Sequence, residues 1–600
     1  MNNISFDIAS LREAYRSSGL SPADVASEAL RRIQAYGDPA VWITRVPARD
    51  VLARARVLMA QRQSETQPLW GIPFAVKDNI DVAGLPTTAG CPAFAYRPAR
   101  NARSIERLIA AGAIFLGKTN LDQFATGLVG TRSPYGAPRC VFDSRYVSGG
   151  SSSGSAIAVA AGLVSFSLGT DTAGSGRVPA AYNNIVGLKP TRGVISTNGV
   201  VPACRSLDCV SIFANAVGDA AEILRVAEGF DADDIYSRHS VPRTLPQAKF
   251  RFGILAWEDR EFFGDAENAG LYENAISRLT SLGGDAVEID YAPFRAAGDL
   301  LYQGPWTAER RAAIKDFMAR HEDAMDPTVR SIIAGARTLT AVEAFEGQYR
   351  LAAARRAADA EWTRVDILLL PTVPIQDSVD EVNADPIARN ARLGRYTNFV
   401  NLLDCCAIAV PAGFRRDGLA FGVSLVAPAC SDASLAGIAD SFHRASDCGM
   451  GVARGAHIPE ASRVVLAEDQ SRIPVFVVGA HLSGMVLNHQ LTELGGVFYA
   501  AARTAPDYRL YVLPRTWPAK PGLLRTPHDS GPGIVGEIWT LSAEAFGRFV
   551  AGIPSPLGLG KVMLEDGASV SGFLCEAHAV EDAFEITDFG GWRRYIESQA

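Results

Sequence analysis

The sequence has no histidine in its first 238 residues and no uninterrupted run of about 18 apolar residues. The missing apolar run excludes an ordinary membrane-spanning helix, and residues 1–33 lack the basic and apolar regions of a signal peptide. We therefore expect a soluble protein. The missing histidines matter for the glycine- and serine-rich segment 147–184, because a serine nucleophile there would have no histidine base nearby in the sequence.

Basic charge and paired cysteines are also scarce. The chain has 58 lysines and arginines against 65 acidic residues, a net charge of −7, and no long basic run. Neither nucleic acid nor an anionic membrane is therefore an expected partner. The nine cysteines are scattered, with no pair of CxxC motifs, which favours a reducing cytoplasm over a disulfide framework. Because HExxH and clustered metal ligands are also missing, we expect no metal and no organic cofactor.

The sequence does contain a long alternation of helical and strand-like segments. Over residues 1–445 this alternation predicts an α/β domain with a mixed, largely buried central sheet flanked by helices. Residues 446–471 combine glycine, proline and charge with weak periodicity, and are predicted to be a linker. Short strands and glycine turns in residues 472–600 predict a separate, smaller α+β domain.

One motif matches a known pattern and is nevertheless rejected. The segment GAIFLGKT, residues 112–119, fits the phosphate-loop pattern G-x-x-x-x-G-K-[ST]. A phosphate loop needs a strand before its first glycine and a helix after its lysine, so that free N–H groups point at phosphate. Here a helical segment precedes Gly112, and AIFL is itself strand-like. We therefore predict no nucleotide site.

Lys77 is a candidate base for a serine nucleophile. The segment GIPFAVKDNI places it at the end of an apolar run. A lysine accepts a proton only when it is neutral, so its pKa must fall well below the usual value of about 10.4, through burial or nearby positive charge. The same position is open to another interpretation, in which the amine reaches solvent from a strand end.

Several motifs together resemble the amidase signature family. They are the Lys77 segment, GGSSSGSA from Gly149 and GTDTAGSGRVPAA from Gly169, with AGAIFLGKTNLDQFATG and NNIVGLKPTRGVIS resembling the flanking motifs. The resemblance implies amide hydrolysis by a Ser–Ser–Lys triad. Ser175 would be the nucleophile, Ser151 a bridging serine preceded by a cis peptide, and Lys77 the terminal base. Ser151 would then relay the proton between Ser175 and Lys77.

The segment around the nucleophile is expected to supply an oxyanion hole. Small residues let the backbone approach a substrate closely, and backbone N–H groups stabilise a tetrahedral oxyanion. The groups implied are those of Thr172, Ala173, Gly174 and Ser175. Asp171 is expected to orient this loop and to pair with Arg177. Flexible linkers would also be rich in glycine and serine, but the apolar AIAVAAGLVSFSL between the two motifs argues for burial.

Departures from the usual motifs indicate a branch of the family. Ser153, Ala173 and Gly176 resemble the branch that hydrolyses allophanate (urea-1-carboxylate), as does the additional C-terminal region. That substrate is a small anionic amide, and an arginine suits its carboxylate. In LYQGPWTAER, Tyr302 and Arg310 resemble substrate-binding residues, and their spacing of about two helical turns would place both on one face.

Spacing alone would equally fit an exposed arginine and a packed tyrosine on an ordinary helix. The resemblance further implies a backbone contact from Gly127 to the substrate. Gln123 stands where many relatives have glutamate, and no consequence of that difference follows from the sequence.

The segment VFVVGAHLSGMVLNHQLTELGG resembles the start of a γ-glutamyl-cyclotransferase-like domain. The hypothesis is that this domain processes N-carboxycarbamate, the first product, to ammonia and carbon dioxide, with His489 as acid/base. His481 would assist, and the N–H groups of Ser483 and Gly484 would hold a carboxylate. Because that product decays unaided and isolated histidines are more often structural, the domain could instead be structural or an assembly surface. A homodimer is expected from the resemblance.

Other functions stay open at this point. They are an amidase of broader substrate range, a non-catalytic scaffold and one component of a glutamine-dependent amidotransferase. The charge balance offers no support for a tRNA-facing surface. The intact set of Lys77, Ser151 and Ser175 argues against a scaffold, which would not need all three.

Overall fold

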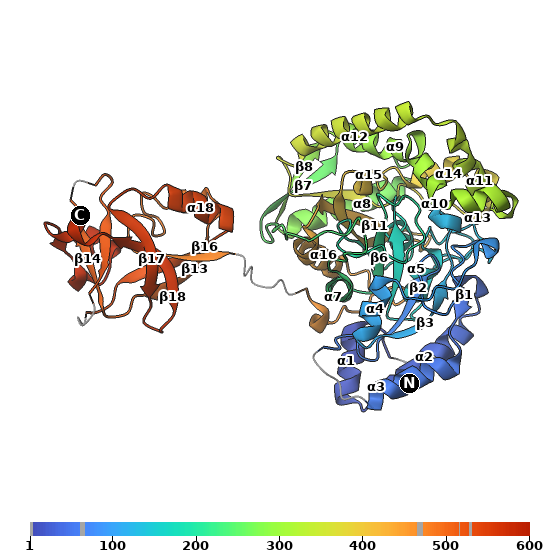
Figure 1. Ribbon diagram of the computed structural model, residues 1–600, viewed down its shortest axis with the longest axis horizontal. Helices are drawn as coiled ribbons and strands as arrows, with labels where there is room; N and C mark the ends of the chain where they lie inside the picture. Colours follow the sequence, from blue (N-terminus) through green and yellow to red (C-terminus); the bar gives the residue numbers. More distant parts are fainter. Residues whose placement is uncertain (1–3, 61–65, 465–471, 515, 527–530, 600) are drawn as a thin grey trace. The chain divides into compact units, whose positions relative to one another are not determined.

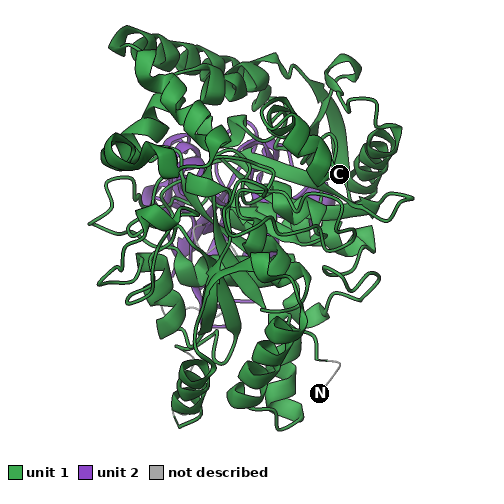
Figure 2. Cartoon of the chain, turned by 90° about the vertical axis from the view of Figure 1, so that its right-hand side faces the viewer, with its two compact units in different colours: residues 1–465 green, residues 466–600 purple. Residues whose placement is uncertain are grey.

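The protein consists of two compact units, residues 1–465 and 466–600 (Figure 2). The structure, a computed structural model, describes residues 4–60, 66–464, 472–514, 516–526 and 531–599. Unit 1 carries the segments that resemble an amidase, and unit 2 carries the C-terminal motif.

An eleven-stranded mixed sheet forms the centre of unit 1, in the order β1-β3-β2-β4-β6-β5-β10-β11-β9-β7-β8 (Figure 1). Strand β2 pairs in parallel with β3 and β4, and β7 pairs in parallel with β8 and β9, whereas the other pairs are antiparallel. The strands are β1 Trp42–Arg45, β2 Pro73–Lys77, β3 Ile114–Thr119, β4 Phe166–Asp171, β5 Val186–Lys189, β6 Cys209–Ala214, β7 Phe250–Leu255, β8 Gly284–Ile289, β9 Ile367–Pro371, β10 Cys405–Phe414 and β11 Ala420–Pro428. This arrangement confirms the predicted mixed central sheet.

Helices surround this sheet, with α1 to α3 at one end of unit 1 and α9 and α12 at the other (Figure 1). Their bounds are α1 Ile8–Ser17, α2 Pro22–Ala35, α3 Ala48–Ala60, α4 Arg103–Ala110, α5 Ser153–Ala160, α6 Val178–Tyr182, α7 Val217–Ala227, α8 Ala266–Ser281, α9 Ala292–Gln303, α10 Trp306–His321, α11 Pro327–Ala334, α12 Ala341–Glu361, α13 Val379–Ala384, α14 Ala388–Leu393, α15 Phe399–Leu402 and α16 Asp432–Ser446. Every residue of α5 is buried, so its small side chains lie in the core as predicted. None of the described helices combines the length and apolar character needed to cross a membrane.

The strand and helix order around Gly112 confirms that the phosphate-loop match is accidental. Helix α4 ends at Ala110, before Gly112, while Lys118 lies inside β3. The Lys118 Nζ atom is 3.1 Å from Asp78 Oδ1, and both side chains are fully buried. The lysine of the motif is therefore the partner of a buried carboxylate.

Residues 446–464, which we expected to begin the linker, pack onto unit 1 instead. Met450 and Ile458 are buried against Ala216, and the Gly451 N–H donates to Asn184 O at 2.8 Å. Turn-forming residues carry no periodic hydrophobic signal, which is why the sequence pattern concealed these contacts. The remaining linker residues, 465–471, lie outside the described part of the chain.

Unit 2 contains a five-stranded sheet, β13-β16-β12-β18-β17, and a three-stranded sheet, β15-β14-β19. Its elements are β12 Ile473–Val477, α17 His489–Thr492, β13 Val497–Arg503, β14 Tyr508–Val512, β15 Pro521–Arg525, β16 Val535–Leu541, α18 Ala543–Ala551, β17 Leu557–Met563, β18 Ser569–Cys575, β19 Phe584–Glu585 and α19 Trp592–Gln599. A separate apolar core, which includes Val475, Phe476 and Trp539, lies beneath these sheets. This unit is the predicted smaller α+β fold.

Candidate active site

The central sheet brings the candidate base and the bridging serine together. Lys77 is the last residue of β2, and Thr170 is the penultimate residue of β4, which runs parallel to β2. Parallel neighbours end at the same edge of a sheet, so these side chains meet there. Ser151 lies two residues before the start of α5, and all three residues are buried.

The Lys77 amine has two hydroxyl partners. Its Nζ atom lies 2.8 Å from Ser151 Oγ and 2.8 Å from Thr170 Oγ1, and no carboxylate of the described residues lies within 4 Å. Burial lowers the pKa of Lys77 to about 7, although three nearby aspartates raise it. Lys77 is fully buried, which excludes the alternative in which its amine reaches solvent. An amine with this pKa is substantially neutral near pH 7 and can accept a proton from Ser151.

The turn before Ser151 is held by a buried carboxylate. The N–H groups of Gly130 and Arg132 each donate to Asp122 at 3.0 Å, and the Asp122 N–H donates to Ser151 O at 3.0 Å. A Cβ atom at Gly150 would lie 2.2 Å from Asp122 Oδ2, so only glycine fits there. The Gly150–Ser151 peptide bond is cis, as the family resemblance implied.

Ser175 lies in a tight turn between β4 and α6 that is organised by a buried ion pair. The guanidinium of Arg177 donates to Asp171 from Nε at 2.9 Å and from Nη2 at 3.0 Å. The N–H groups of Gly174 and Gly176 donate to the same carboxylate. Burial alone would raise the pKa of Asp171, but the Arg177 charge and these donors lower it. The predicted pairing of Arg177 with Asp171 is confirmed.

In the described part of the chain, Ser151 is hydrogen-bonded to Lys77 but not to Ser175. Ser175 is 2% exposed, and within the described residues no hydrogen bond joins its Oγ atom to Ser151 Oγ. Catalytic hydrogen bonds often tighten only when substrate binds. The step from Ser175 to Ser151 therefore stays a prediction.

The backbone beside Ser175 offers part of the predicted oxyanion hole. The Gly174 N–H donates to a buried aspartate and is not free for an oxyanion. The N–H groups of Thr172, Ala173 and Ser175 enter no hydrogen bond within the part of the chain that the structure describes. Gly174 has φ +137°, and a Cβ there would lie 2.5 Å from Thr397 Oγ1, so the turn requires glycine.

Tyr302 and Arg310 meet, but not on one helix. Tyr302 lies on α9 and Arg310 on α10, and the two helices are separated at Gly304 and Pro305. The expectation of a single helical face was wrong, because glycine and proline end a helix, and GP in LYQGPWTAER was the available signal. Arg310 Nη2 still lies 3.4 Å from the Tyr302 hydroxyl, and its guanidinium carbon lies 5.3 Å from the centre of the Tyr302 ring.

Arg310 is a buried cation without a carboxylate partner. It is 2% exposed, and no carboxylate of the described chain lies within 4 Å of it. Its other contacts are Thr126 Oγ1 at 3.2 Å and Ala125 O at 3.4 Å, and its Nε atom has no hydrogen-bond partner among the described residues. Because burying an unpaired charge is costly, this arrangement suits an anionic ligand.

Two further sequence candidates lie on the loop that contacts Arg310. Gly127 follows Thr126, with φ +157°, and a Cβ there would lie 2.6 Å from Asp122 Oδ2. Gln123 donates from Nε2 to Gly90 O and accepts from the Asp326 N–H at 2.7 Å. Glutamine thus ties this loop to the start of α11, a bond in which its Oε1 acts as acceptor.

Two models of known protein families match the chain. The family model "Amidase" matches residues 24–436. The chain belongs to the amidase family. A second model, "Allophanate hydrolase C-terminal domain", matches residues 473–597 of this amidase.

Relatives of this amidase match over most of its length. Urea amidolyase of Saccharomyces cerevisiae is 42% identical over 93% of the chain, which spans 31% of that relative's length. Urea amidolyase of Lachancea kluyveri is 43% identical, again over 93% of the chain and 31% of the relative. The structure of Kluyveromyces lactis allophanate hydrolase is 40% identical and covers 99% of both chains, with a TM-score of 0.84. The chain thus spans about a third of the length of the two curated relatives.

In unit 2 of this amidase, the two histidines lie in different surroundings. The His481 ring stacks on Phe573 with centroids 5.3 Å apart, and its Nε2 lies 2.9 Å from Gln490 Oε1. Burial lowers the pKa of His481, which lines a cavity of about 490 Å³. His489 is exposed, and its Nδ1 lies 3.0 Å from Val486 O.

The backbone donor expected to hold a carboxylate in unit 2 already holds one from the protein. The N–H and hydroxyl of Ser483 each donate to Glu537 Oε2 at 2.8 Å, and Trp539 Nε1 donates to the same atom at 3.0 Å. Gly484 is exposed, with φ +74°. Glu537 had no predicted role, and nothing in its sequence surroundings pointed to Ser483.

Sequence reasoning also missed three residues beside the Lys77 site. Thr170 binds the lysine, Asp122 holds the turn of the bridging serine, and Asp208 accepts from Thr172 Oγ1 at 2.5 Å. Thr170 and Asp122 lie inside recognised motifs, which was the available signal, whereas Asp208 lies outside them and had none. No group of three or more metal-ligating side chains occurs among the described residues, and all nine cysteines are free thiols.

Proposed function

We propose that this amidase hydrolyses allophanate, using Ser175 as nucleophile, Ser151 as proton relay and Lys77 as terminal base. The observation that carries the proposal is a buried amine with a lowered pKa, hydrogen-bonded to Ser151, in the same unit as an unpaired buried arginine. The likeness to Kluyveromyces lactis allophanate hydrolase over the whole chain supports this substrate.

The reaction begins with attack of Ser175 Oγ on the carbamoyl carbon of allophanate. Ser151 takes the Ser175 proton and gives its own to neutral Lys77, while free N–H groups among Thr172, Ala173 and Ser175 stabilise the oxyanion. The tetrahedral intermediate collapses when the relay returns a proton to the leaving nitrogen, which departs as ammonia. Water then attacks the acyl-enzyme along the same relay and releases N-carboxycarbamate.

The substrate's carboxylate is assigned to Arg310. A guanidinium binds a carboxylate through two N–H groups, and burial strengthens that attraction. Tyr302, which contacts the guanidinium, helps to orient it and supplies a hydroxyl to the substrate. Gly127, on the loop beside Arg310, contributes a backbone contact.

The C-terminal domain is assigned the conversion of N-carboxycarbamate to ammonia and carbon dioxide. His489 is its acid/base, with His481, Ser483 and Gly484 nearby in the same segment. His489 is exposed, which supports the role, although its Nδ1 lies 3.0 Å from Val486 O. The Ser483 donors are engaged by Glu537, so they hold a substrate carboxylate only if Glu537 moves.

The proposed molecule is a cytoplasmic homodimer with its C-terminal domain over residues 472–600. Because residues 446–464 of the expected linker 446–471 pack onto unit 1, the domains join after them. Nine free thiols fit a reducing compartment. Analytical ultracentrifugation tests the dimer, and limited proteolysis tests the boundary.

Ammonia release from freshly prepared allophanate tests the function, with biuret, malonamate and a simple aliphatic amide as competing substrates. We expect activity confined to allophanate and close carboxylated analogues, and its loss in Ser175→Ala. Ser165→Ala is a matched control, because the buried Ser165 hydroxyl has no hydrogen-bond partner within the described part of the chain. Cleavage of neutral amides through Ser175, with allophanate ignored, would retain the triad and reject the substrate in favour of a broader amidase. No cleavage of any amide would favour a scaffold.

A further inference from the structure

A buried carboxylate joins the nucleophile's segment to a small surface pocket. Asp208 is 6% exposed and accepts hydrogen bonds from Thr172 Oγ1 at 2.5 Å, Ala203 N at 2.8 Å and Cys204 N at 3.2 Å. No lysine or arginine nitrogen of the described residues lies within 4 Å of it. The contacts that hold the carboxylate therefore come from neutral donors.

The sheet places Asp208 opposite Thr172. Strands β4 and β6 pair antiparallel, and their last paired residues are Asp171 and Cys209. One step beyond that pair, the two chains present Thr172 and Asp208 to each other. A side-chain hydrogen bond between them thus follows the last backbone pair of the two strands. It fixes the start of the segment that leads to Ser175.

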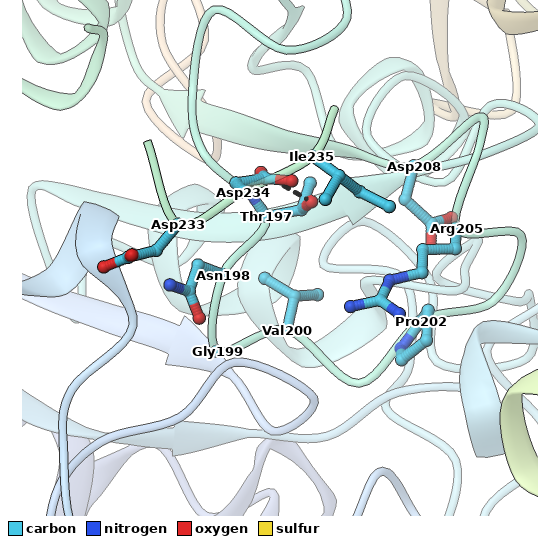
Figure 3. Close-up of a pocket in the computed structure, with 10 residues that line it drawn as sticks. All are labelled: Thr197, Asn198, Gly199, Val200, Pro202, Arg205, Asp208, Asp233, Asp234 and Ile235. Carbon is cyan, nitrogen blue, oxygen red and sulfur yellow. Dashed lines mark hydrogen bonds between the residues drawn. The ribbon is translucent and has the colours of Figure 1, made fainter. Parts of the chain in front are cut away.

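On its other side Asp208 lines a pocket of about 100 Å³ (Figure 3). Figure 3 shows Asp208 and Arg205 at one end of this pocket, while Asp233 lies at the opposite end. The carboxylate thus lies between this pocket and the Thr172 hydroxyl.

We propose that Asp208 is a positioning residue for the amidase reaction, which anchors the Thr172 end of the nucleophile's segment through the Thr172 hydroxyl. A second effect of the same residue is the action of its charge on Lys77. The proposal rests on the proposed function for its mechanism, because it assumes that Lys77 is the base.

The charges around Lys77 determine the direction in which loss of Asp208 should shift the pKa of Lys77. Burial lowers the pKa of Lys77, the carboxylates of Asp122, Asp208 and Asp171 raise it, and Arg310 lowers it. Removing the Asp208 charge should therefore lower the pKa of Lys77 further. The amine would then stay neutral at lower pH.

Asp208 is itself subject to opposing influences. Burial raises the pKa of Asp208 to about 6, while its hydrogen bonds from Thr172, Ala203 and Cys204, and the charge of Arg310, lower it. In the wild type, Asp208 becomes protonated below that pH, and the neutral carboxyl group no longer raises the pKa of Lys77. The substitution removes that charge at every pH.

The test is the pH profile of kcat/KM for Asp208→Asn, measured on whichever amide the wild type cleaves. We expect its acidic limb to move by about half a pH unit or more to lower pH. Because the asparagine oxygen can still accept from the Thr172 hydroxyl, Asp208→Ala tests the anchor, and its kcat should fall at least about tenfold. Asp233→Asn is the matched control, because it changes an aspartate of the same pocket and should leave both quantities unchanged. An unmoved limb in Asp208→Asn would overturn the charge role, and an unchanged kcat in Asp208→Ala would overturn the anchoring role.

Thr172 variants test the anchor even if Asp208→Asn fails to fold, as judged by circular dichroism. Thr172→Ser keeps the hydroxyl and should retain kcat within about threefold, whereas Thr172→Val should lose at least about tenfold with its acidic limb in place. Equal kcat values for the two variants would overturn the proposal. If allophanate is not cleaved but another amide is, the proposed substrate fails while the Asp208 measurements on that amide still stand.

Discussion

The two units of this protein place their candidate chemical groups in opposite environments. In unit 1, Lys77, Ser151 and Ser175 are at most 2% exposed, and burial brings the pKa of Lys77 to about 7. In unit 2, His489 is exposed on a short helix. A base with an intrinsic pKa near 10.4 needs a buried site, whereas a histidine is already poised near neutrality and can work at a surface.

The largest effect is expected when the buried base of unit 1, Lys77, is removed. We expect Lys77→Met to lower kcat/KM by at least about 10³-fold, because the relay then has no terminal acceptor. Lys315→Met, on the exposed face of α10, should leave activity unchanged. Ammonia release under initial-rate conditions measures both variants. Substantial activity in Lys77→Met would show that burial of this amine serves stability alone.

Arg310→Gln tests whether the buried cation of unit 1 recognises the charge of the substrate. Losing the buried cation should lower kcat/KM for allophanate by about 100-fold, with a raised KM, while a neutral amide loses at most about threefold. Arg320→Ala, at an exposed site on the same helix, serves as control. Equal losses for the anionic and the neutral substrate would remove Arg310 from the carboxylate role.

The pH dependence tests the pKa of Lys77 directly. The reaction needs neutral Lys77, and the neutral fraction rises with pH until the pKa is passed. We therefore expect kcat/KM to increase about tenfold per unit well below pH 7 and to level off above it. Initial rates from pH 5 to 9 provide the measurement. A profile that still rises steeply above pH 9 would indicate a lysine with an ordinary pKa.

The smallest effect is expected at His489. His489→Gln should slow carbon dioxide release by about twofold to tenfold and leave the first ammonia unchanged, because N-carboxycarbamate also decays unaided. His578→Gln, at another exposed histidine of unit 2, is the control. Identical carbon dioxide progress curves for wild type and His489→Gln would favour a structural role for unit 2.

The sequence predicted the fold class because periodicity is local. Apolar runs such as the one ending at Lys77 became fully buried strands, and the small residues of 153–160 became a buried helix. The domain boundary was harder to predict. Residues 446–464 pack onto unit 1 through a few apolar side chains, and the turn-forming residues around them give no periodic pattern. Gly304 and Pro305 are the local signal for the helix break between Tyr302 and Arg310.

By itself the sequence determined the chemical types at the site, since Lys77, Ser151 and Ser175 each lie in a recognisable motif. Only the tertiary structure decided their surroundings. The hydroxyl of Thr170 at Lys77 and the carboxylate of Asp208 at Thr172 come from partners far apart in the chain. Burial and through-space charge set a pKa, and both depend on which distant segments pack together, so no local pattern encodes them.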